Sequence, residues 1–443
     1  MIRGSRCEVP PSPWIKEING QLWAEEVPFL VLAERYGTPL HVYSALAIRT
    51  AFQSISQALE GIPHFVAYAV KANGNPTILR LLAGLGAWAD TVSGGELFWA
   101  HRAGIPADHT LMSGVGKTEK EIEFAFRLGI RSLNIESVEE LEVVQSVASS
   151  LGCQARVGVR LNPHIDPHTH PYIATGIHGT KFGLEIEEAR EVLKQISKSP
   201  ILTLECIASH IGSQITELDA IEESAFLTSL FFEEAIKEGH TPHVLDLGGG
   251  WPLAYGDEES SVPSHRAFGQ AIRRGIEKSG WLERAQKHKG LFLVVEPGRA
   301  IVGEGGALLT RVLFVKRSPS KRFVIVDAAM TELIRPALYG AYHAVVPVIN
   351  PARPPLDKAD IVGPVCETGD FFALNRPFPE VKRGELLILR STGAYGAAMS
   401  SEYNGRPKAA EVMVDGSKAH LIRPRGKWED LHVDPAWPFL ASE

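Results

Sequence analysis

The sequence predicts an N-terminal (β/α)8 TIM barrel followed by a C-terminal antiparallel β domain, itself a barrel or a sandwich. Between residues 40 and 305 short apolar runs alternate with amphipathic helical patterns. These units fill about 265 residues, near the roughly 250 of a typical barrel. After residue 305 strand patterns follow one another with few helical patterns between them. An open doubly wound sheet is the alternative for the first part, and the size favours the barrel.

Eight strands and seven helices are expected in the barrel. The predicted strands are 64–71, 88–92, 110–113, 132–136, 155–161, 204–210, 243–247 and 291–296. The helical patterns are 76–85, 95–103, 119–128, 138–151, 185–197, 218–239 and 265–278. A helix between consecutive strands is the connection that this barrel requires.

The β domain is predicted from seven further strand patterns and one hairpin signal. The strands are 307–316, 322–327, 344–349, 359–365, 385–389, 411–414 and 420–423. Asp415-Gly416 is the residue pair of a tight hairpin turn. A helical pattern at 28–36 is expected to pack on this domain. The expected domains are therefore an N-terminal segment 1–37, a barrel 38–305 and a β domain 306–443.

Composition excludes several classes of protein. The 443 residues are 44% apolar and 22% charged, as in ordinary globular proteins. A net charge of −7 gives no electrostatic case for binding nucleic acid or an anionic membrane. No apolar run reaches the roughly 20 residues of a membrane span, and residues 1–13 lack the apolar core of a signal peptide. We therefore expect a cytoplasmic protein. Its four scattered cysteines form no C-x-x-C pair, which argues against disulfides and structural zinc.

Lys71 is the first candidate for chemistry. It stands at the end of the first predicted barrel strand, after an apolar run that reads as buried on both faces. Burial favours the neutral amine of a lysine, which is the form that Schiff-base chemistry requires. The alternative is a lysine that simply emerges into solvent.

Other polar and glycine residues stand at the ends of the later predicted strands. Gly248, Gly249 and Gly250 follow the seventh strand, and triple glycines allow backbone N–H groups to approach a phosphate closely. Together with Lys71 they suggest pyridoxal phosphate as the cofactor. Glu296, at the end of the eighth strand, is then placed to keep the pyridine nitrogen protonated. The alternatives are a glycine-rich turn and, for His210 after the sixth strand, a core histidine instead of one stacked on the ring.

Eight short runs resemble diaminopimelate decarboxylases, in the alanine-racemase-like class of pyridoxal-phosphate enzymes that also holds ornithine decarboxylases. They are Tyr68-Ala69-Val70-Lys71-Ala72-Asn73, Ser93-Gly94-Gly95-Glu96, Ser209-His210-Ile211-Gly212-Ser213, Leu247-Gly248-Gly249-Gly250, Glu296-Pro297-Gly298-Arg299, Arg335-Pro336-Ala337-Leu338-Tyr339, Cys366-Glu367-Thr368-Gly369-Asp370 and Gly393-Ala394-Tyr395-Gly396. Each run alone is weak. Together, in the order of the family, they are specific and cover most of the chain from about residue 28.

The resemblance implies a role for each matching residue. Lys71 would carry the cofactor, His210 would stack on its ring and Glu296 would contact the ring nitrogen. The cofactor site as a whole is expected to include Lys71, Asp90, His210, Ser213, Gly248, Gly249, Gly250, Glu296, Gly298, Arg299 and Tyr395. Cys366 would be the acid that protonates the substrate carbon, supplied with Glu367 across a homodimer interface. The substrate would be bound by Arg299, Arg335, Tyr339, Glu367 and Tyr395.

The activity that the resemblance implies is decarboxylation of meso-diaminopimelate to L-lysine, the last step of lysine biosynthesis, without metal or nicotinamide. The alternatives are a decarboxylase of D-lysine or D-ornithine, a racemase, and a non-catalytic binding protein of the same fold. Retention of both Arg299 and Arg335 weighs against the first, because a substrate without a distal carboxylate would leave arginines poorly paired. Lys71 and Cys366 weigh against the others. The histidine-rich stretch 164–170 lacks the spacing of a metal site.

Overall fold

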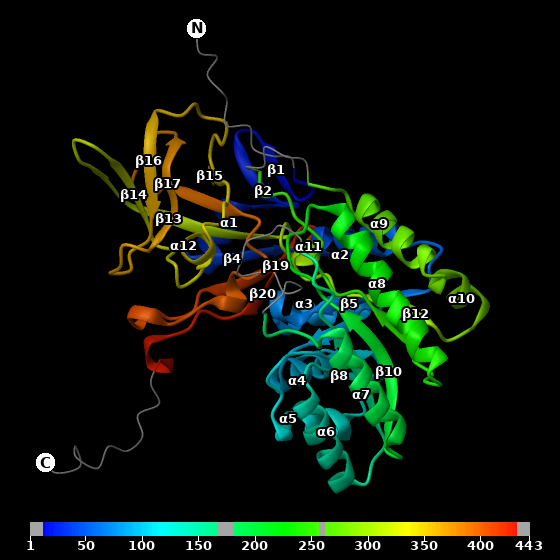
Figure 1. Cartoon of the computed structure of the whole chain (residues 1–443). Helices are drawn as coiled ribbons and strands as arrows, with labels where there is room; N and C mark the ends of the chain where they lie inside the picture. The colour runs from blue at the N-terminus through cyan, green and yellow to red at the C-terminus, as the bar shows by residue number, and fades with distance from the viewer. Residues whose placement is uncertain (1–11, 167–179, 257–261, 432–443) are drawn as a thin grey trace, which may run out of the picture. The chain divides into compact units, whose positions relative to one another are not determined.

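The computed structural model describes residues 12–166, 180–256 and 262–431. The chain divides into two compact units (Figure 1). One unit comprises residues 48–254 and 258–302, and we call it the barrel unit. The other comprises residues 1–47, 255–257 and 303–443, and we call it the β unit. Within the described ranges, none of the helices combines the length and the hydropathy that crossing a membrane requires.

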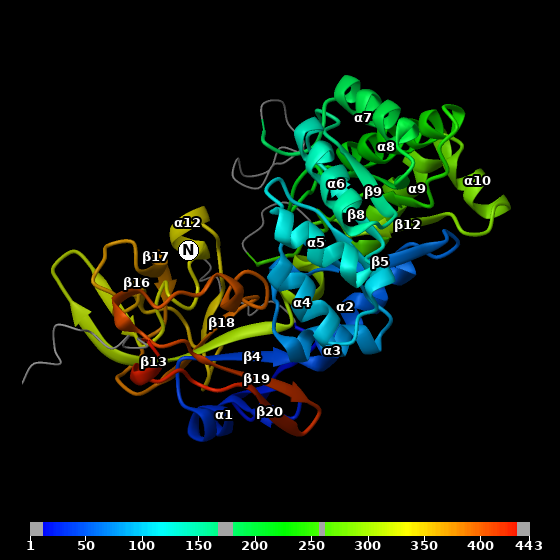
Figure 2. The same cartoon turned by 90° about the horizontal axis from the view of Figure 1, so that it is seen from below.

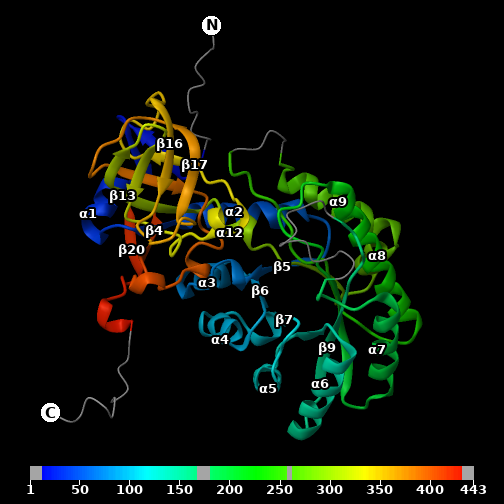
Figure 3. The same ribbon diagram turned by 60° about the vertical axis from the view of Figure 1, so that its left-hand side comes forward.

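The barrel unit contains a closed eight-stranded barrel, as the sequence predicts. Its parallel strands are β5 (His64–Ala69), β6 (Trp88–Thr91), β7 (Thr110–Met112), β8 (Ser132–Ile135), β9 (Ala155–Leu161), β10 (Leu202–Ser209), β11 (Val244–Asp246) and β12 (Phe292–Val295). The helices are α2 (Ala45–Ala58), α3 (Pro76–Gly84), α4 (Gly94–Arg102), α5 (Glu119–Leu128), α6 (Val138–Leu151), α7 (Ile186–Lys198), α8 (Leu218–Lys237), α9 (His265–Lys278), α10 (Trp281–Lys287) and α11 (Arg299–Val302). Helices α7 and α8, which lie on the outside of the barrel in Figure 3, both pack against β10.

Local sequence signals fix where the barrel helices begin and end. The Asn75 side chain accepts a hydrogen bond from the backbone N–H of Thr77 and caps α3. Helix α5 begins with a capping box between Thr118 and Glu121 and ends at Gly129, which adopts the left-handed conformation. These caps satisfy backbone groups that a helix end leaves without partners. They explain why these helix boundaries follow the sequence patterns closely.

The barrel interior changes from apolar at one end to polar at the other. A cluster that includes Trp88, Leu111 and Val244 fills the apolar part, and the rings of Phe65 and Trp88 stack with centroids 4.4 Å apart. Further along β8, the side chain of Asn134 occupies space that Gly158 on β9 leaves open. A Cβ on Gly158 would lie 2.1 Å from Asn134 Oδ1. Polar side chains therefore begin within the barrel, toward the carboxyl ends of its strands.

The β unit holds a nine-stranded sheet and a three-stranded sheet. The smaller sheet is β1 (Ile15–Ile18), β2 (Gln21–Ala24) and β3 (Val27–Pro28). The larger one contains β4 (Leu40–Ser44), β13 (Gly306–Arg317), β14 (Arg322–Val326), β15 (Val345–Pro347), β16 (Asp357–Val362), β17 (Phe371–Phe378), β18 (Leu386–Arg390), β19 (Ala410–Asp415) and β20 (Lys418–Arg423). Figure 2 shows β4, β19 and β20 side by side, in agreement with their pairing.

The β unit differs from the prediction in its details. Its larger sheet is mixed, because β4 pairs in parallel with β19 and β14 pairs in parallel with β16. Strands β1 to β4 and β17 are absent from the predicted list. Strands β1 to β3 have only two to four residues each, too short for a clear periodic signal. Helix α1 (Phe29–Tyr36) packs Phe29 and Leu32 into a core shared with β4, β13 and β19, as expected for the helix at 28–36.

Replacing Gly158 by alanine should destabilise the barrel unit. The added Cβ would meet Asn134 Oδ1, Ser132 Oγ at 2.8 Å and Cys206 Cβ at 2.9 Å, none of which can move freely in a packed interior. We expect a loss of roughly 1–3 kcal/mol in the free energy of unfolding, measured in urea. Gly84→Ala is the control, because nothing lies within 4 Å of its Cβ position. Equal stability of the two variants would contradict this account of the interior.

Candidate active site

Lys71 lies just beyond the end of a barrel strand. Strand β5 ends at Ala69, and Lys71 is the middle residue of a 3-10 turn over Val70–Ala72. The predicted strand end at Lys71 is therefore two residues too far. Its Nζ lies 3.3 Å from Asp90 Oδ2, and 36% of the lysine side chain is exposed against 1% for Asp90. The turn places the amine at the open end of the barrel, against a buried carboxylate.

Three buried carboxyl groups lie at this end of the barrel, namely Asp90 on β6, Asp246 on β11 and Glu296 after β12. Burial, with the nearby Asp90 as a further cause, raises the pKa of Asp246 to about 7. Burial, followed by repulsion from Asp246 and Asp90, also raises the pKa of Glu296. The charge of Lys71 opposes that rise. Asp90 Oδ1 has no hydrogen-bond partner although it is buried. These carboxyl groups together favour a further positive charge.

The triple glycine closes tightly around the same end of the barrel. Gly248 and Gly250 have φ angles of +64° and +90°, which favour glycine. A Cβ on Gly249 would lie 2.6 Å from the carbonyl oxygen of Glu296, and one on Gly248 would lie 2.7 Å from His210 Nδ1. The backbone approaches its neighbours too closely for any side chain. A cradle of this kind suits a phosphate held by backbone groups.

His210 is held as a neutral imidazole. Its Nδ1 accepts a hydrogen bond of 3.1 Å from the backbone N–H of Gly249, so that nitrogen carries no proton. Burial lowers the pKa of His210 well below its usual value, and the positive charges of Lys71 and Arg160 lower it further. A neutral ring is suited to stacking on an aromatic cofactor without adding a charge.

Arg299 and Ser213 come together beside the cradle. The Nη2 of Arg299 donates a hydrogen bond of 3.0 Å to Ser213 Oγ, and the arginine is only 6% exposed. Gly298 precedes it in close contact with β5, because a Cβ there would lie 3.0 Å from that of Ala69. An arginine and a hydroxyl at the glycine cradle form a donor set suited to an anionic oxygen.

The barrel unit thus brings together every predicted cofactor residue that lies in it. They are Lys71, Asp90, His210, Ser213, Gly248, Gly249, Gly250, Glu296, Gly298 and Arg299. Pyridoxal phosphate fits these residues. Its protonated ring nitrogen would supply the positive charge that the carboxyl groups favour, and its phosphate matches the glycine cradle with Arg299. The amine of Lys71 would bind the aldehyde carbon of the cofactor.

The remaining predicted residues lie in the β unit. Arg335 begins α12 (Arg335–Tyr339) and is 6% exposed. Its guanidinium carbon lies 4.7 Å from the centroid of the Tyr255 ring, and its Nη1 donates to His343 Nε2 at 2.8 Å. His343 Nδ1 in turn donates to the backbone oxygen of Arg390. The Tyr255 ring and His343 therefore help to fix the orientation of the Arg335 guanidinium.

Cys366 and Glu367 lie in an exposed loop with a buried anchor. The carboxylate of Asp370 accepts hydrogen bonds of 2.7 Å from the backbone N–H groups of Met330 and Val365. The backbone N–H of Cys366 donates to Asn404 Oδ1 at 3.0 Å. Both Cys366 and Glu367 are exposed in the single chain, whereas Asp370 is buried. The fold presents the thiol outward on a fixed loop.

Tyr339 and Tyr395 are both half-buried. Tyr339 ends α12, four residues after Arg335. Tyr395 adopts a φ of +58°, an uncommon backbone conformation for a tyrosine. Such strain is retained where the surroundings impose it, often at a functional site.

Three residues at these sites are absent from the sequence-based assignment. Asp246 directly precedes the Leu247-Gly248 turn, and its position at a strand end was a usable signal. Tyr255 and His343 carry no such signal, because they reach Arg335 from distant parts of the chain. In the histidine-rich stretch, residues 167–170 lie outside the described residues. Within the described ranges, no group of three His, Cys, Asp or Glu residues could hold a metal ion.

Comparison with known proteins identifies the class. A family model described as "Pyridoxal-dependent decarboxylase, pyridoxal binding domain" matches residues 46–303. That range includes β5 to β12 with Lys71, His210 and Glu296. The barrel and its site are thus those of a pyridoxal-dependent decarboxylase.

Full-length relatives give the family. The chain is 45% identical over 419 residues to a diaminopimelate decarboxylase of Zymomonas mobilis, covering 94% of this chain and 97% of the relative. It superimposes on a crystal structure of diaminopimelate decarboxylase from Helicobacter pylori complexed with L-lysine with a TM-score of 0.84, at 39% identity, covering 91% of this chain and 98% of that one. For the M. jannaschii enzyme in co-complex with L-lysine the TM-score is 0.90, at 33% identity, covering 97% and 99%. The chain belongs to the diaminopimelate decarboxylase family.

The buried carboxyl groups predict a pH dependence of stability in the cofactor-free protein. The folded Asp246 has a pKa of about 7 against an ordinary 3.8, so the folded state holds the extra proton between these values. Stability therefore falls as pH rises from about 4 to about 7, by up to about 1.4 kcal/mol per pH unit for one proton, and levels off above that range. Asp246→Asn should make this slope shallower, as measured by urea unfolding at pH 5 to 8.

Asp108→Asn is the matched control, since this aspartate is exposed in the same unit. It should leave the slope unchanged. A wild-type slope retained in Asp246→Asn would show that this carboxyl group holds no extra proton.

Proposed function

We propose that this protein decarboxylates meso-2,6-diaminopimelate to L-lysine and CO2 with pyridoxal 5′-phosphate as cofactor. The observation that carries the proposal is a lysine paired with buried Asp90, at a barrel end with two further buried carboxyl groups, in a chain 45% identical, over 97% of the relative's length, to a diaminopimelate decarboxylase. Two solved relatives contain L-lysine, the product of this reaction.

The cofactor would be held by the barrel unit. Lys71 would bind its aldehyde carbon and Glu296 its ring nitrogen, while the neutral His210 lies against the ring. The phosphate would bind at the glycines 248–250, with Arg299 as the positive partner and Tyr395 as a further hydroxyl donor. The close packing of Gly248 on His210 and of Gly249 on Glu296 supports this assignment, because it fixes the glycine turn beside the two residues assigned to the ring.

Bound pyridoxal phosphate would take up the electron pair that is left when the bond between the D-centre carbon and its carboxyl group breaks. The ionised Glu296 would favour that uptake by keeping the ring nitrogen protonated. CO2 would leave, and the thiol of Cys366 would donate a proton to the same carbon. Cys366 would regain its proton from solvent. The reaction thus consumes one proton for each CO2 released.

The distal end of the substrate carries its own ammonium and carboxylate groups. Arg335 and Arg299 would bind the carboxylate, and Glu367 would pair with the ammonium, with Tyr339 beside them. The rigid support of Arg335 by Tyr255 and His343 favours this role, because a fixed guanidinium recognises a carboxylate by shape as well as by charge.

The first test is CO2 release by the pyridoxal-phosphate-loaded protein from meso-diaminopimelate, D-lysine and L-ornithine. The Arg335→Met variant then tests whether Arg335 recognises the distal carboxylate of the substrate. We expect kcat/KM for diaminopimelate to fall by roughly 2–4 kcal/mol, because the carboxylate loses one partner of a desolvated charge pair. Turnover of D-lysine, which lacks that carboxylate, should change much less.

Arg353→Met is the control, because this arginine pairs with Glu385 within the β unit and has no proposed role in binding. It should leave both substrates unaffected. An equal loss for diaminopimelate and D-lysine in Arg335→Met would make Arg335 a structural residue and remove the support for this substrate.

We further propose a homodimer in which Cys366 and Glu367 of one chain complete the barrel site of the other. Their exposure in the single chain supports this arrangement. Mixing inactive Lys71→Ala with inactive Cys366→Ala should restore partial activity, because a hybrid dimer contains one intact site. The measurement is CO2 release after subunit exchange, which mass spectrometry follows independently. Exchange without recovered activity would rule out the shared site.

A further inference from the structure

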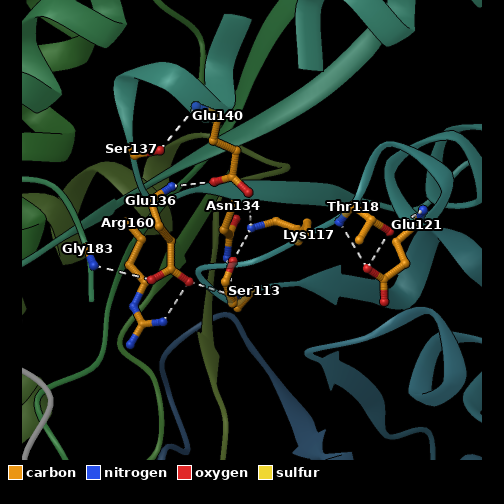
Figure 4. Close-up of polar contacts among 11 residues, drawn as sticks. Ser113, Lys117, Thr118, Glu121, Asn134, Glu136, Ser137, Glu140, Arg160 and Gly183 are labelled. Carbon is orange, nitrogen blue, oxygen red and sulfur yellow. Dashed lines mark hydrogen bonds and ion pairs between the residues drawn. The ribbon is translucent and has the colours of Figure 1, made fainter. Parts of the chain in front are cut away.

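A second polar cluster lies at the ends of β7, β8 and β9, and the proposed function assigns it no role (Figure 4). Its centre is Glu136, the residue after β8, which is 6% exposed. The Glu136 carboxylate accepts a hydrogen bond of 2.6 Å from the backbone N–H of Gly114 and one of 3.2 Å from that of Gly183. It also accepts a charge-assisted bond of 2.9 Å from Arg160 Nη1. One carboxylate thus joins three segments that follow different strands.

Glu136 is itself held in place by Glu140 and, through it, by Lys117. Its backbone N–H donates to Glu140 Oε2 at 2.8 Å, and Glu140 pairs with Lys117 Nζ at 2.8 Å. The Lys117 side chain is 1% exposed and also donates to the backbone oxygen of Gly114 at 2.5 Å. Figure 4 shows Lys117 and Glu140 on one side of Glu136 and Arg160 on the other. The two acids and two bases are equal in number, which offsets part of the cost of burying their charges.

Arg160 connects this cluster with the residues of the candidate active site. It precedes the last residue of β9, is 7% exposed, and occupies the same row of the barrel as Ala208 and Asp246. Its guanidinium carbon lies 5.2 Å from the centroid of the Phe182 ring. Its positive charge lowers the pKa of both His210 and Asp246. Arg160 therefore acts electrostatically on two groups at the barrel mouth, and Glu136 determines where its guanidinium lies.

A stabilising role alone does not explain this arrangement. A buried ion pair is weak support for stability, because desolvation offsets most of the attraction between its charges. A charge fixed at several points in a water-poor site is well suited to acting on a ligand, since it needs no reorganisation when the ligand arrives. The four-residue cluster fixes the Arg160 guanidinium in this way.

We propose that Glu136 is a positioning residue that holds Arg160 at the barrel mouth, where the guanidinium binds an anionic oxygen of the cofactor or of the substrate. The inference rests on the proposed function, because it takes the ligands from there. Glu136 touches neither ligand and acts through Arg160. Lys117 and Glu140 hold Glu136 in turn.

A double-mutant cycle tests this chain of contacts. Glu136→Gln, Arg160→Met and the double variant are compared with wild type for kcat, for KM and for the dissociation constant of pyridoxal phosphate from the apoenzyme. We expect each single variant to lose roughly 10- to 100-fold in at least one of these, the range for a misplaced active-site group. The double variant should lose no more than Arg160→Met, because Glu136 has no effect once Arg160 is absent. A raised dissociation constant of pyridoxal phosphate would show that Arg160 binds an oxygen of the cofactor. A raised KM without that change would show that it binds an oxygen of the substrate.

Glu121→Gln is the matched control. Its carboxylate likewise accepts a bond of 2.8 Å from a loop glycine, Gly94, but it contacts no arginine in the described interactions. It should remain within about threefold of wild type in every constant, as expected of a variant away from the site. Should Glu136→Gln fail to fold, Glu136→Asp takes its place in the cycle, because it keeps the charge and only withdraws the carboxylate from Arg160.

Losses that multiply in the double variant would overturn the proposal, and so would a normal Arg160→Met enzyme. Cofactor binding to the apoenzyme is measured without substrate. A wild type that binds pyridoxal phosphate but releases no CO2 from diaminopimelate would refute the proposed activity, and the cycle on the dissociation constant would still decide the role of Glu136.

Discussion

The burial of like charges at one end of the barrel is the constraint on which the site depends. Asp90, Asp246 and Glu296 are nearly inaccessible to water, and Lys71 is the cation that contacts Asp90. Three carboxylates cannot ionise together in such a place without more positive charge. The protonated ring nitrogen of pyridoxal phosphate would supply that charge if the cofactor binds at these residues as proposed.

At the barrel end, the backbone is positioned by glycines and the charged side chains are positioned by ion pairs. The glycines let the main chain pack closely on His210 and Glu296, and any Cβ at Gly248 or Gly249 would collide with these neighbours. Charged side chains are instead fixed by other charged side chains, as Arg160 is by Glu136. The packed glycine backbone and the paired charges both have fixed positions before a ligand binds. Little reorganisation is therefore required during the reaction.

In the β unit, Arg335 is supported by an aromatic ring and an imidazole. Arg335 rests on the Tyr255 ring and on His343, whose other nitrogen is anchored to a backbone oxygen. These contacts hold the guanidinium in one orientation. The same unit presents Cys366 on an exposed loop that is held from beneath by buried Asp370. Arg335, proposed for substrate specificity, and Cys366, proposed for proton donation, thus both belong to the β unit.

The sequence by itself determined the eight-stranded barrel, the lysine after its first strand and the glycine cradle after its seventh. These features are local, because periodicity, helix caps and glycine clusters depend on residues that are close together in the sequence. Only the tertiary structure decided which side chains contact the candidate site residues. Tyr255 and His343 reach Arg335, and Glu136 joins three loops, through contacts that no spacing along the chain reveals. Raised pKa values at Asp246 and Glu296 likewise require burial and proximity, which only the closed barrel creates.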